Sequence, residues 1–221
     1  MNLKGKLIAF LGDSITFGIG ASAPEHRYST VTARALGAVE HNMGISGTVM
    51  CSGGHRLCRL PDIDQIPQDA DLVFILLGIN DFDQCVVSEE ATYYALGTPD
   101  NSDTSTIYGA ANAFCQKLSL RFGKTTTKVV FGTPIESGWN SSVAPGVSDN
   151  FDPNKRCACG HTLRELCEAI ASTAASYGFA VCDLNREVHV TAEDFIDGLH
   201  PNDGGMQKIA DVLKAFLCAL A

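Results

Sequence analysis

A serine follows the first apolar run of this 221-residue chain. Residues 7–11 are five consecutive apolar residues, a pattern typical of a strand buried on both faces of a parallel sheet. The run ends at Gly12, and a tight turn there would place the Ser14 hydroxyl at the carboxyl edge of the sheet, where open α/β sheets bind ligands. Ser14 is therefore a candidate nucleophile, provided that the chain also supplies a base and donors for an oxyanion.

The best candidate base lies near the other end of the chain. His200 stands three residues after Asp197, between the last predicted strand and the last predicted helix. On a loop or a single turn, this separation lets the Asp197 carboxylate reach Nδ1 of His200, fix its tautomer and stabilise the imidazolium. An isolated D-x-x-H pattern could equally order a loop before a helix. Together with a serine at a strand end, it predicts a catalytic triad of Ser14, His200 and Asp197.

Two further positions could stabilise an oxyanion. Asn80 follows the apolar run 72–77 and offers a side-chain NH₂ group. Gly47 offers a backbone N–H in a glycine-rich loop, where a bare backbone can approach a substrate closely. The N–H of Ser14 is the third candidate donor. Taken singly, Asn80 could be an ordinary turn residue and Gly47 an ordinary left-handed position.

The elements that must position these residues alternate along the chain. This alternation implies right-handed crossovers and a parallel sheet covered by helices on both faces. We expect one three-layer α/β domain over residues 1–221, with insertions at 83–105 and 135–160. The apolar runs predict strands at 7–11, 38–42, 72–77, 127–131 and 179–184, and helical periodicity predicts helices at 29–37, 61–68, 105–121, 162–177 and from 203.

Composition excludes several classes of partner. Hydrophobic residues make up 45% of the chain and charged residues 19%, which favours a folded core. The net charge of −9 argues against a nucleic-acid backbone or an anionic membrane as partner. No apolar run approaches the roughly 20 residues that span a bilayer. Residues 1–5 lead directly into the first strand without a signal peptide, and nine cysteines suit a reducing compartment, so we expect a cytoplasmic protein.

One cysteine cluster has the donor types of a zinc site. Cys157, Cys159 and His161 lie close together in the sequence, and Cys167 follows. Their spacing differs from the usual gap between paired cysteine ligands, and no second pair lies nearby. We therefore expect buried or idle thiols rather than a metal site.

The motifs together resemble those of the SGNH hydrolases, also called the GDSL esterase/lipase family. They occur in the family's order and span nearly the whole chain. Gly44 competes with Gly47 as the match to the family's oxyanion glycine. The matching stretches are Gly12-Asp13-Ser14 for the nucleophile block, residues 42–47 for the glycine block, Gly78-Ile79-Asn80-Asp81 for G-x-N-D, and residues 197–201 for D-x-x-H-P.

The resemblance implies a flavodoxin-like fold with a five-stranded parallel sheet in the order 2-1-3-4-5. It implies ester hydrolysis through an acyl-serine intermediate, with Ser14, His200 and Asp197 as the triad and without a metal or organic cofactor. Ser14, Gly47 and Asn80 would form the oxyanion hole. The family varies in the regions of the two insertions, which would shape the substrate pocket. Asp13 and Trp139 are candidate pocket residues.

Several functions fit these patterns. We favour hydrolysis of small-molecule esters with short acyl chains, such as acetyl esters, because the insertions are polar. A carbohydrate O-deacetylase is the alternative, since Trp139 and Tyr93-Tyr94 could stack on a sugar ring, although they could equally cap a core. A non-catalytic flavodoxin-like binding module would be expected to lack a triad member, and none is missing here. A flavin-binding module would be yellow when purified.

Overall fold

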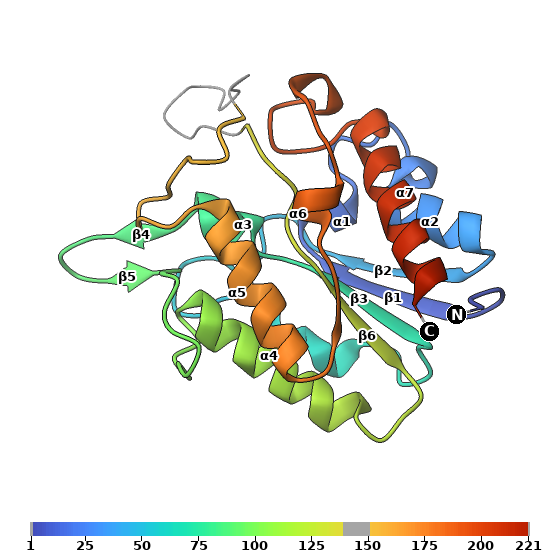
Figure 1. The fold of residues 1–221 in the computed structure, drawn as a ribbon, viewed down its shortest axis with the longest axis horizontal. Coiled ribbons are helices and arrows are strands. Elements are labelled where there is room, and N and C mark those ends of the chain that lie inside the picture. The colour runs from blue at the N-terminus through green and yellow to red at the C-terminus, as the bar shows by residue number, and fades with distance from the viewer. Residues whose placement is uncertain (1, 139–150, 221) are drawn as a thin grey trace.

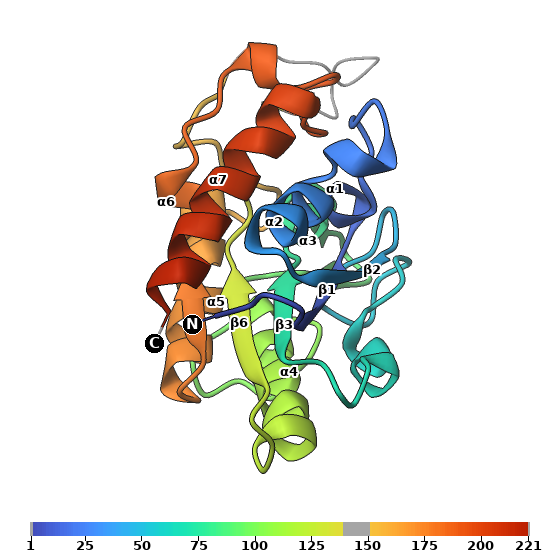
Figure 2. The same cartoon turned by 90° about the vertical axis from the view of Figure 1, so that its right-hand side faces the viewer.

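A five-stranded parallel sheet forms the centre of the computed structural model, which describes residues 2–138 and 151–220 (Figure 1). The strand order is β2-β1-β3-β6-β7, which confirms the predicted order 2-1-3-4-5 for the five strands of this sheet. Figure 2 shows β6, β3, β1 and β2 side by side in this sequence. The strands are β1 (Leu7–Gly12), β2 (Val39–Gly44), β3 (Leu72–Leu76), β6 (Lys128–Gly132) and β7 (Ala180–Cys182).

The register of the sheet aligns the strand ends. Gly12 at the end of β1 pairs with Gly44 on β2 and with Leu76 on β3. Leu76 pairs in turn with Gly132 on β6, which pairs with Cys182 on β7. Because all five strands are parallel, the segments that follow them emerge at one edge of the sheet. The predicted site residues Ser14, Gly47 and Asn80 therefore start from neighbouring strand ends.

Four long helices cover the two faces of the sheet. Helix α2 packs beside α7, and α4 packs beside α5 on the opposite face (Figure 1). Each helix is amphipathic, so its apolar stripe faces the sheet. The four helices confirm the predicted ones to within two residues at each end: α2 (Tyr28–Leu36), α4 (Ile107–Phe122), α5 (Leu163–Ser176) and α7 (Asp203–Ala219).

Short elements connect these layers, and most of them were not predicted. The predicted helix at 61–68 is a 3₁₀ helix, and the first insertion contains an antiparallel hairpin of β4 and β5. Most of these elements have two to five residues and are too short to show a period in the sequence. They are α1 (Ser14–Phe17), α3 (Ile79–Asp83), α6 (Leu184–Glu187), β4 (Val86–Val87), β5 (Thr92–Tyr93) and the 3₁₀ helices Pro24–His26, Leu60–Gln65 and Ala192–Asp194.

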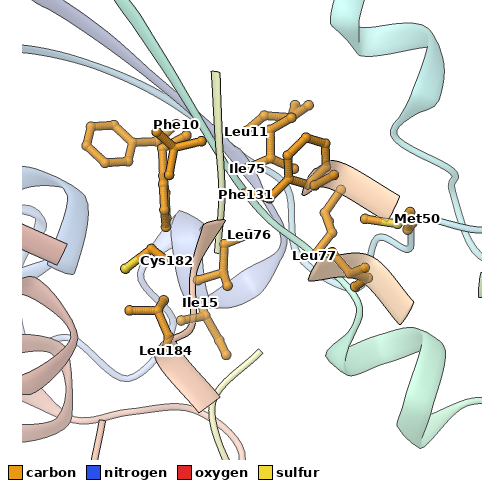
Figure 3. Close-up of a cluster of buried hydrophobic side chains, with 14 of the residues drawn as sticks. Phe10, Leu11, Ile15, Met50, Ile75, Leu76, Leu77, Phe131, Cys182 and Leu184 are labelled. Carbon is orange, nitrogen blue, oxygen red and sulfur yellow. The ribbon is translucent and has the colours of Figure 1, made fainter. Parts of the chain in front are cut away.

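The hydrophobic core continues from the sheet to the turn that carries Ser14. Figure 3 shows Leu76 of β3, Cys182 of β7 and Leu184 of α6 near Ile15, the residue after Ser14. Ile15 is buried, and burial of such a side chain stabilises a fold by about 1.5–3 kcal/mol. The core thus anchors α1 directly beside the candidate nucleophile. Among the described residues, no helix combines the length and apolarity that a membrane span requires.

Two leucines on α4 test the placement of the core. Leu118 is fully buried, whereas Leu120 is 82% exposed. We expect Leu118→Ala to lower the free energy of unfolding by about 2–5 kcal/mol, because it removes buried apolar contacts and leaves a cavity. Leu120→Ala is the matched control and should change the free energy by at most about 0.5 kcal/mol. Urea unfolding measures both values, and equal effects would contradict the assigned face of α4.

Candidate active site

Three predicted residues form one hydrogen-bonded chain. Oγ of Ser14 lies 3.0 Å from Nε2 of His200, although 186 positions separate the two residues. Nδ1 of His200 lies 2.6 Å from Oδ2 of Asp197. A carboxylate only accepts hydrogen bonds, so Nδ1 carries the proton and Nε2 accepts from the Ser14 hydroxyl. The hydroxyl is therefore oriented toward a group that can remove its proton.

Local contacts fix Ser14 at the start of α1. The side chain of Asp13 accepts a hydrogen bond of 2.9 Å from the N–H of Ile15 and so caps this one-turn helix. Two residues after Ser14, the Thr16 hydroxyl is hydrogen-bonded to the buried hydroxyl of Tyr28 at 2.7 Å. The helix ends at Gly18, whose N–H donates to the Ser14 carbonyl. Because α1 is held from both sides, the serine is presented in a defined orientation.

Asp13, a predicted pocket residue, is almost fully buried, with 1% of its surface exposed. Burial raises the pKa of Asp13 to about 7, while the hydrogen bond from Ile15 favours the charged form. The hydrogen bond that the structure gives its carboxylate is the one that caps α1.

The turn before α7 orients the Asp197 carboxylate. Its Oδ1 accepts from the backbone N–H groups of Leu199 and His200, at 3.0 and 2.7 Å, and Oδ2 accepts from the imidazole. Burial acts to raise the pKa of Asp197, but the hydrogen bonds from His200 and Leu199 outweigh it and hold the pKa below its usual value. Asp197 is therefore charged at neutral pH and can stabilise an imidazolium.

The segment after β6 supports this turn. The N–H of Gly138 and the hydroxyl of Ser137 both donate to the carbonyl of Gly198, at 2.8 and 3.2 Å. On the other side, the N–H of Ile196 donates to the carbonyl of His200. Gly198 has φ 82°, a backbone conformation that disfavours other residues. These contacts fix the backbone between Asp197 and His200.

The loop after β2 is tied to α3 through two adjacent side chains. Nδ2 of Asn80 donates to the carbonyl of Thr48 at 2.9 Å. The carboxylate of Asp81 accepts from the N–H groups of Met50 and Cys51, at 2.9 and 2.8 Å. Burial raises the pKa of Asp81, although these hydrogen bonds favour its charged form. The Asn80 amide carries a second N–H, for which no acceptor is found among the described residues, so it can serve an oxyanion.

The structure favours Gly47 over Gly44 as the oxyanion glycine. The N–H of Gly44 already donates to Oδ1 of Asn42, at 2.9 Å. A Cβ on Gly44 would come within 2.1 Å of the backbone nitrogen of Phe17, so this glycine allows β2 and α1 to pack closely. Gly47 lies directly before Thr48, which Asn80 binds, and has φ 74°. The loop therefore brings Gly47 and Asn80 into one neighbourhood.

Sequence reasoning missed the arginine that joins the strand ends. Arg59 is fully buried and donates to the carbonyls of Gly12 and Met43, at 2.6 and 2.7 Å. Its guanidinium also pairs with Asp62 at 2.5 Å. Gly12 and Met43 belong to β1 and β2, so one side chain fixes both strand ends beside the site. A lone arginine in a loop carries no signal of such a role.

The cysteine cluster has structural contacts. Sγ of Cys159 lies 3.3 Å from the Tyr93 carbonyl, and its N–H donates to Sγ of Cys85. Nε2 of His161 lies 3.2 Å from the Tyr94 carbonyl. Within residues 2–138 and 151–220, no three His, Cys, Asp or Glu side chains are grouped as metal ligands. These contacts hold the second insertion against the β4-β5 hairpin.

The three aromatic residues that could stack on a sugar, Tyr93, Tyr94 and Trp139, have different positions. Tyr94 is 1% exposed and belongs to the core, so it cannot stack on a substrate in this conformation. Tyr93 is partly buried, with its ring 6.3 Å from that of Tyr94. Trp139 lies outside the described residues.

Known structures share this fold. A protein from Lactobacillus plantarum has a TM-score of 0.78 and 27% identity, with 99% of each chain covered. A protein from Chitinophaga pinensis, described as "a possible lipase", has a TM-score of 0.71 and 20% identity over 96% of this chain and 97% of its own. A member of the lipolytic G-D-S-L family from Veillonella parvula has a TM-score of 0.63 and 15% identity over 98% and 100%. A search of curated proteins finds no match.

The chain has the same three-layer α/β fold as these structures. A comparison with protein families matches residues 10–208 to the GDSL-like lipase/acylhydrolase family. The match includes Ser14, Gly47, Asn80, Asp197 and His200. The chain therefore belongs to the GDSL-like lipase/acylhydrolase family.

The lowered pKa of Asp197 predicts a pH-dependent contribution to stability. A carboxylate with a folded-state pKa below its unfolded value stabilises the fold above the unfolded pKa, and this contribution disappears as pH falls through the folded pKa. We expect Asp197→Asn to lower the free energy of unfolding at neutral pH by about 1.5–3 kcal/mol. The difference in the free energy of unfolding between Asp197→Asn and the unmodified protein should shrink below about pH 3.9.

Urea unfolding at a series of pH values measures this difference. Asp100→Asn is the matched control, because Asp100 is exposed and should contribute at most about 0.5 kcal/mol at any pH. A constant difference between Asp197→Asn and the unmodified protein across the acidic range would show that Asp197 is not held in its charged form.

Proposed function

We propose that this protein hydrolyses carboxylic esters with short acyl chains through an acyl-serine intermediate. The observation that carries the proposal is the hydrogen-bonded chain from Ser14 through His200 to Asp197. Its geometry matches what nucleophilic catalysis needs: a hydroxyl, a base that accepts its proton, and a carboxylate that orients the base. Membership of the GDSL-like lipase/acylhydrolase family supports ester hydrolysis as the reaction class.

Acylation begins at the Ser14 hydroxyl. Nε2 of His200 takes the proton as Oγ of Ser14 attacks the ester carbonyl carbon, and the carbonyl π electrons move to oxygen. The Asp197 carboxylate stabilises the imidazolium that forms. The N–H groups of Ser14 and Gly47 and the second N–H of Asn80 stabilise the oxyanion. When the tetrahedral intermediate collapses, His200 protonates the leaving alkoxide, and the alcohol departs.

Deacylation repeats these steps with water. Nε2 of His200 accepts a proton from a water molecule as its oxygen attacks the acyl-serine carbonyl. The same donors hold the second oxyanion. Its collapse breaks the bond to Oγ of Ser14, and His200 returns the proton to that oxygen. The products are one carboxylic acid and one alcohol, and the enzyme regains its starting protonation state.

The acyl preference depends on the two insertions. The insertion residues that the structure describes expose polar side chains and a short hairpin rather than a long apolar surface. This observation supports short acyl chains over long ones. The carbohydrate alternative now depends on Trp139 and on the partly buried Tyr93, because Tyr94 lies in the core. A panel of 4-nitrophenyl esters of increasing chain length and acetylated sugars separates these preferences.

Replacement of the nucleophile tests the proposed mechanism. We expect Ser14→Ala to lower kcat for 4-nitrophenyl acetate by about 10⁴-fold or more, because no oxygen remains to form the acyl-enzyme. The melting temperature should change little. Ser119→Ala, on α4 and away from the site, is the matched control and should retain full activity. Unchanged turnover by Ser14→Ala would refute the proposal.

Replacement of Asn80 tests the oxyanion site separately. We expect Asn80→Ala to lower kcat by about 10²–10³-fold, because one donor to the developing charge is lost. Asn112→Ala is the control, since that amide also donates to backbone carbonyls, at Pro99 and Asn101, but lies on α4. If both variants lost similar stability and neither lost activity, Asn80 would be only a structural turn residue.

A further inference from the structure

A cationic side chain lies beside the proposed oxyanion glycine. Nη1 of Arg56 is so close to Gly47 that a Cβ on this glycine would come within 2.8 Å of it. Nη2 of Arg56 donates to Oε1 of Gln84 at 3.2 Å. Gln84 follows α3, the helix that carries Asn80, and its N–H donates to the Asn80 carbonyl. The guanidinium therefore bridges the two segments that supply the proposed oxyanion donors.

Arg56 differs from two other arginines, the fully buried Arg59 and the partly buried Arg164. Arg59 pairs with Asp62, and Arg164 pairs with Asp183. Within the part of the chain that the structure describes, no carboxylate lies within ion-pair distance of Arg56, and its Nε is buried without a hydrogen-bond partner. Arg56 is partly buried, and moving a charge partly out of water without a counter-charge costs free energy.

The position of this charge suggests its ligand. A guanidinium presents several N–H donors in one plane and matches the two oxygens of a carboxylate. Nη1 of Arg56 occupies the space where a side chain on Gly47 would begin, so an anionic group bound to it would lie next to the ester carbonyl held by Gly47 and Asn80. The hydrogen bond to Gln84 uses one guanidinium nitrogen, Nη2, and orients the plane of the guanidinium.

We propose that Arg56 is a specificity-determining residue that binds a carboxylate of the substrate. This inference rests on the proposed ester hydrolysis at Ser14. The preferred substrates would then be esters that carry a second, anionic group a few bonds from the scissile carbonyl. The anion could belong to the acyl part or to the alcohol part, and the same guanidinium would recognise either.

Two matched pairs of esters test both locations. For the acyl part, the pair is ethyl hydrogen succinate and ethyl levulinate, in which an acetyl group replaces the carboxylate. For the alcohol part, the pair is 4-acetoxybenzoate and 4-acetoxyacetophenone, with the same replacement. We expect the unmodified protein to show a kcat/KM about 10- to 100-fold higher for the anionic member of one pair, since hydrogen bonds to charged groups contribute this much.

Variants of Arg56 assign that preference to one side chain. Arg56→Gln should abolish the preference, mainly through a higher KM for the anionic ester, so kcat/KM should fall more for the anionic ester than for the neutral one. Arg56→Lys should retain part of the preference, because lysine keeps the positive charge but lacks the two parallel N–H donors of a guanidinium. Arg34→Gln is the matched control, since Arg34 is exposed on α2 and should leave all four rates unchanged.

A salt series gives a readout that needs no variant. The preference of the unmodified protein should fall as sodium chloride rises from about 0.01 to 1 M, because the Debye length shrinks from about 30 to 3 Å. This measurement keeps the proposal testable if Arg56→Gln does not fold.

The outcomes separate this inference from the proposed function. Equal rates within both pairs, with hydrolysis that depends on Ser14, would overturn the role of Arg56 alone. Equal losses for neutral and anionic esters in Arg56→Gln would also overturn it, because Arg56 would then support the Gly47 loop and not a substrate carboxylate. If the unmodified protein hydrolysed neither 4-nitrophenyl acetate nor any of the four esters, the proposed function itself would be wrong.

Discussion

The site depends on one constraint: the parallel strands β1, β2 and β3 end next to one another at the same edge of the sheet. Gly12 pairs with both Gly44 and Leu76, so three chain segments leave the sheet side by side. The turn into α1 is tight: a Cβ on Gly12 would lie 2.0 Å from the Thr16 hydroxyl, and one on Gly44 would meet the backbone of Phe17. Two glycines therefore let α1 cross the end of β2, which directs the Ser14 hydroxyl along the edge of the sheet.

Buried charges replace regular backbone pairing just beyond this edge. Several backbone groups at the ends of β1 and β2 and in the loop after β2 are paired with side chains instead. Arg59 donates to the carbonyls of Gly12 and Met43, while Asp81 accepts from Met50 and Cys51. A guanidinium supplies several donors and a carboxylate several acceptors, so two side chains satisfy four backbone groups.

The same groups also affect one another. Burial is the largest cause of the raised pKa of Asp13, the charge of Asp81 raises it further, and the charge of Arg59 lowers it. A network of this kind stabilises a fold only when all its members are satisfied. It explains how polar residues can lie under an active site without making the loops mobile.

The sequence was sufficient for the layers of the fold and for the three residues that the structure joins in one hydrogen-bonded chain. Buried strands and amphipathic helices produce periods over many residues, and β3 and α7 are clear examples. Ser14, His200 and Asp197 were recognisable because each stands beside an element boundary in a characteristic motif. Asn80 could be predicted for the same reason.

Residues that act through loop backbone could not be predicted in this way. Arg59 and Arg56 lie in a segment without periodicity. Arg59 donates to backbone carbonyls of β1 and β2, and Arg56 donates to the side chain of Gln84. The burial of Asp13 could not be predicted either, because it follows from the capping of α1 by its carboxylate. Neighbours in sequence on a one-turn helix face different environments, and only coordinates show which side is buried.

Net charge is a poor guide to the substrate of such a site. The chain carries a net charge of −9, which by itself would repel an anionic ester at long range. At physiological ionic strength, however, charges more than about 8 Å away through solvent are largely screened. A bound substrate therefore responds chiefly to the groups that touch it, and near Gly47 that group is the guanidinium of Arg56. Because local and overall charge have opposite signs, affinity for an anionic ester would depend on this one contact, whereas the rate of encounter would reflect the acidic surface.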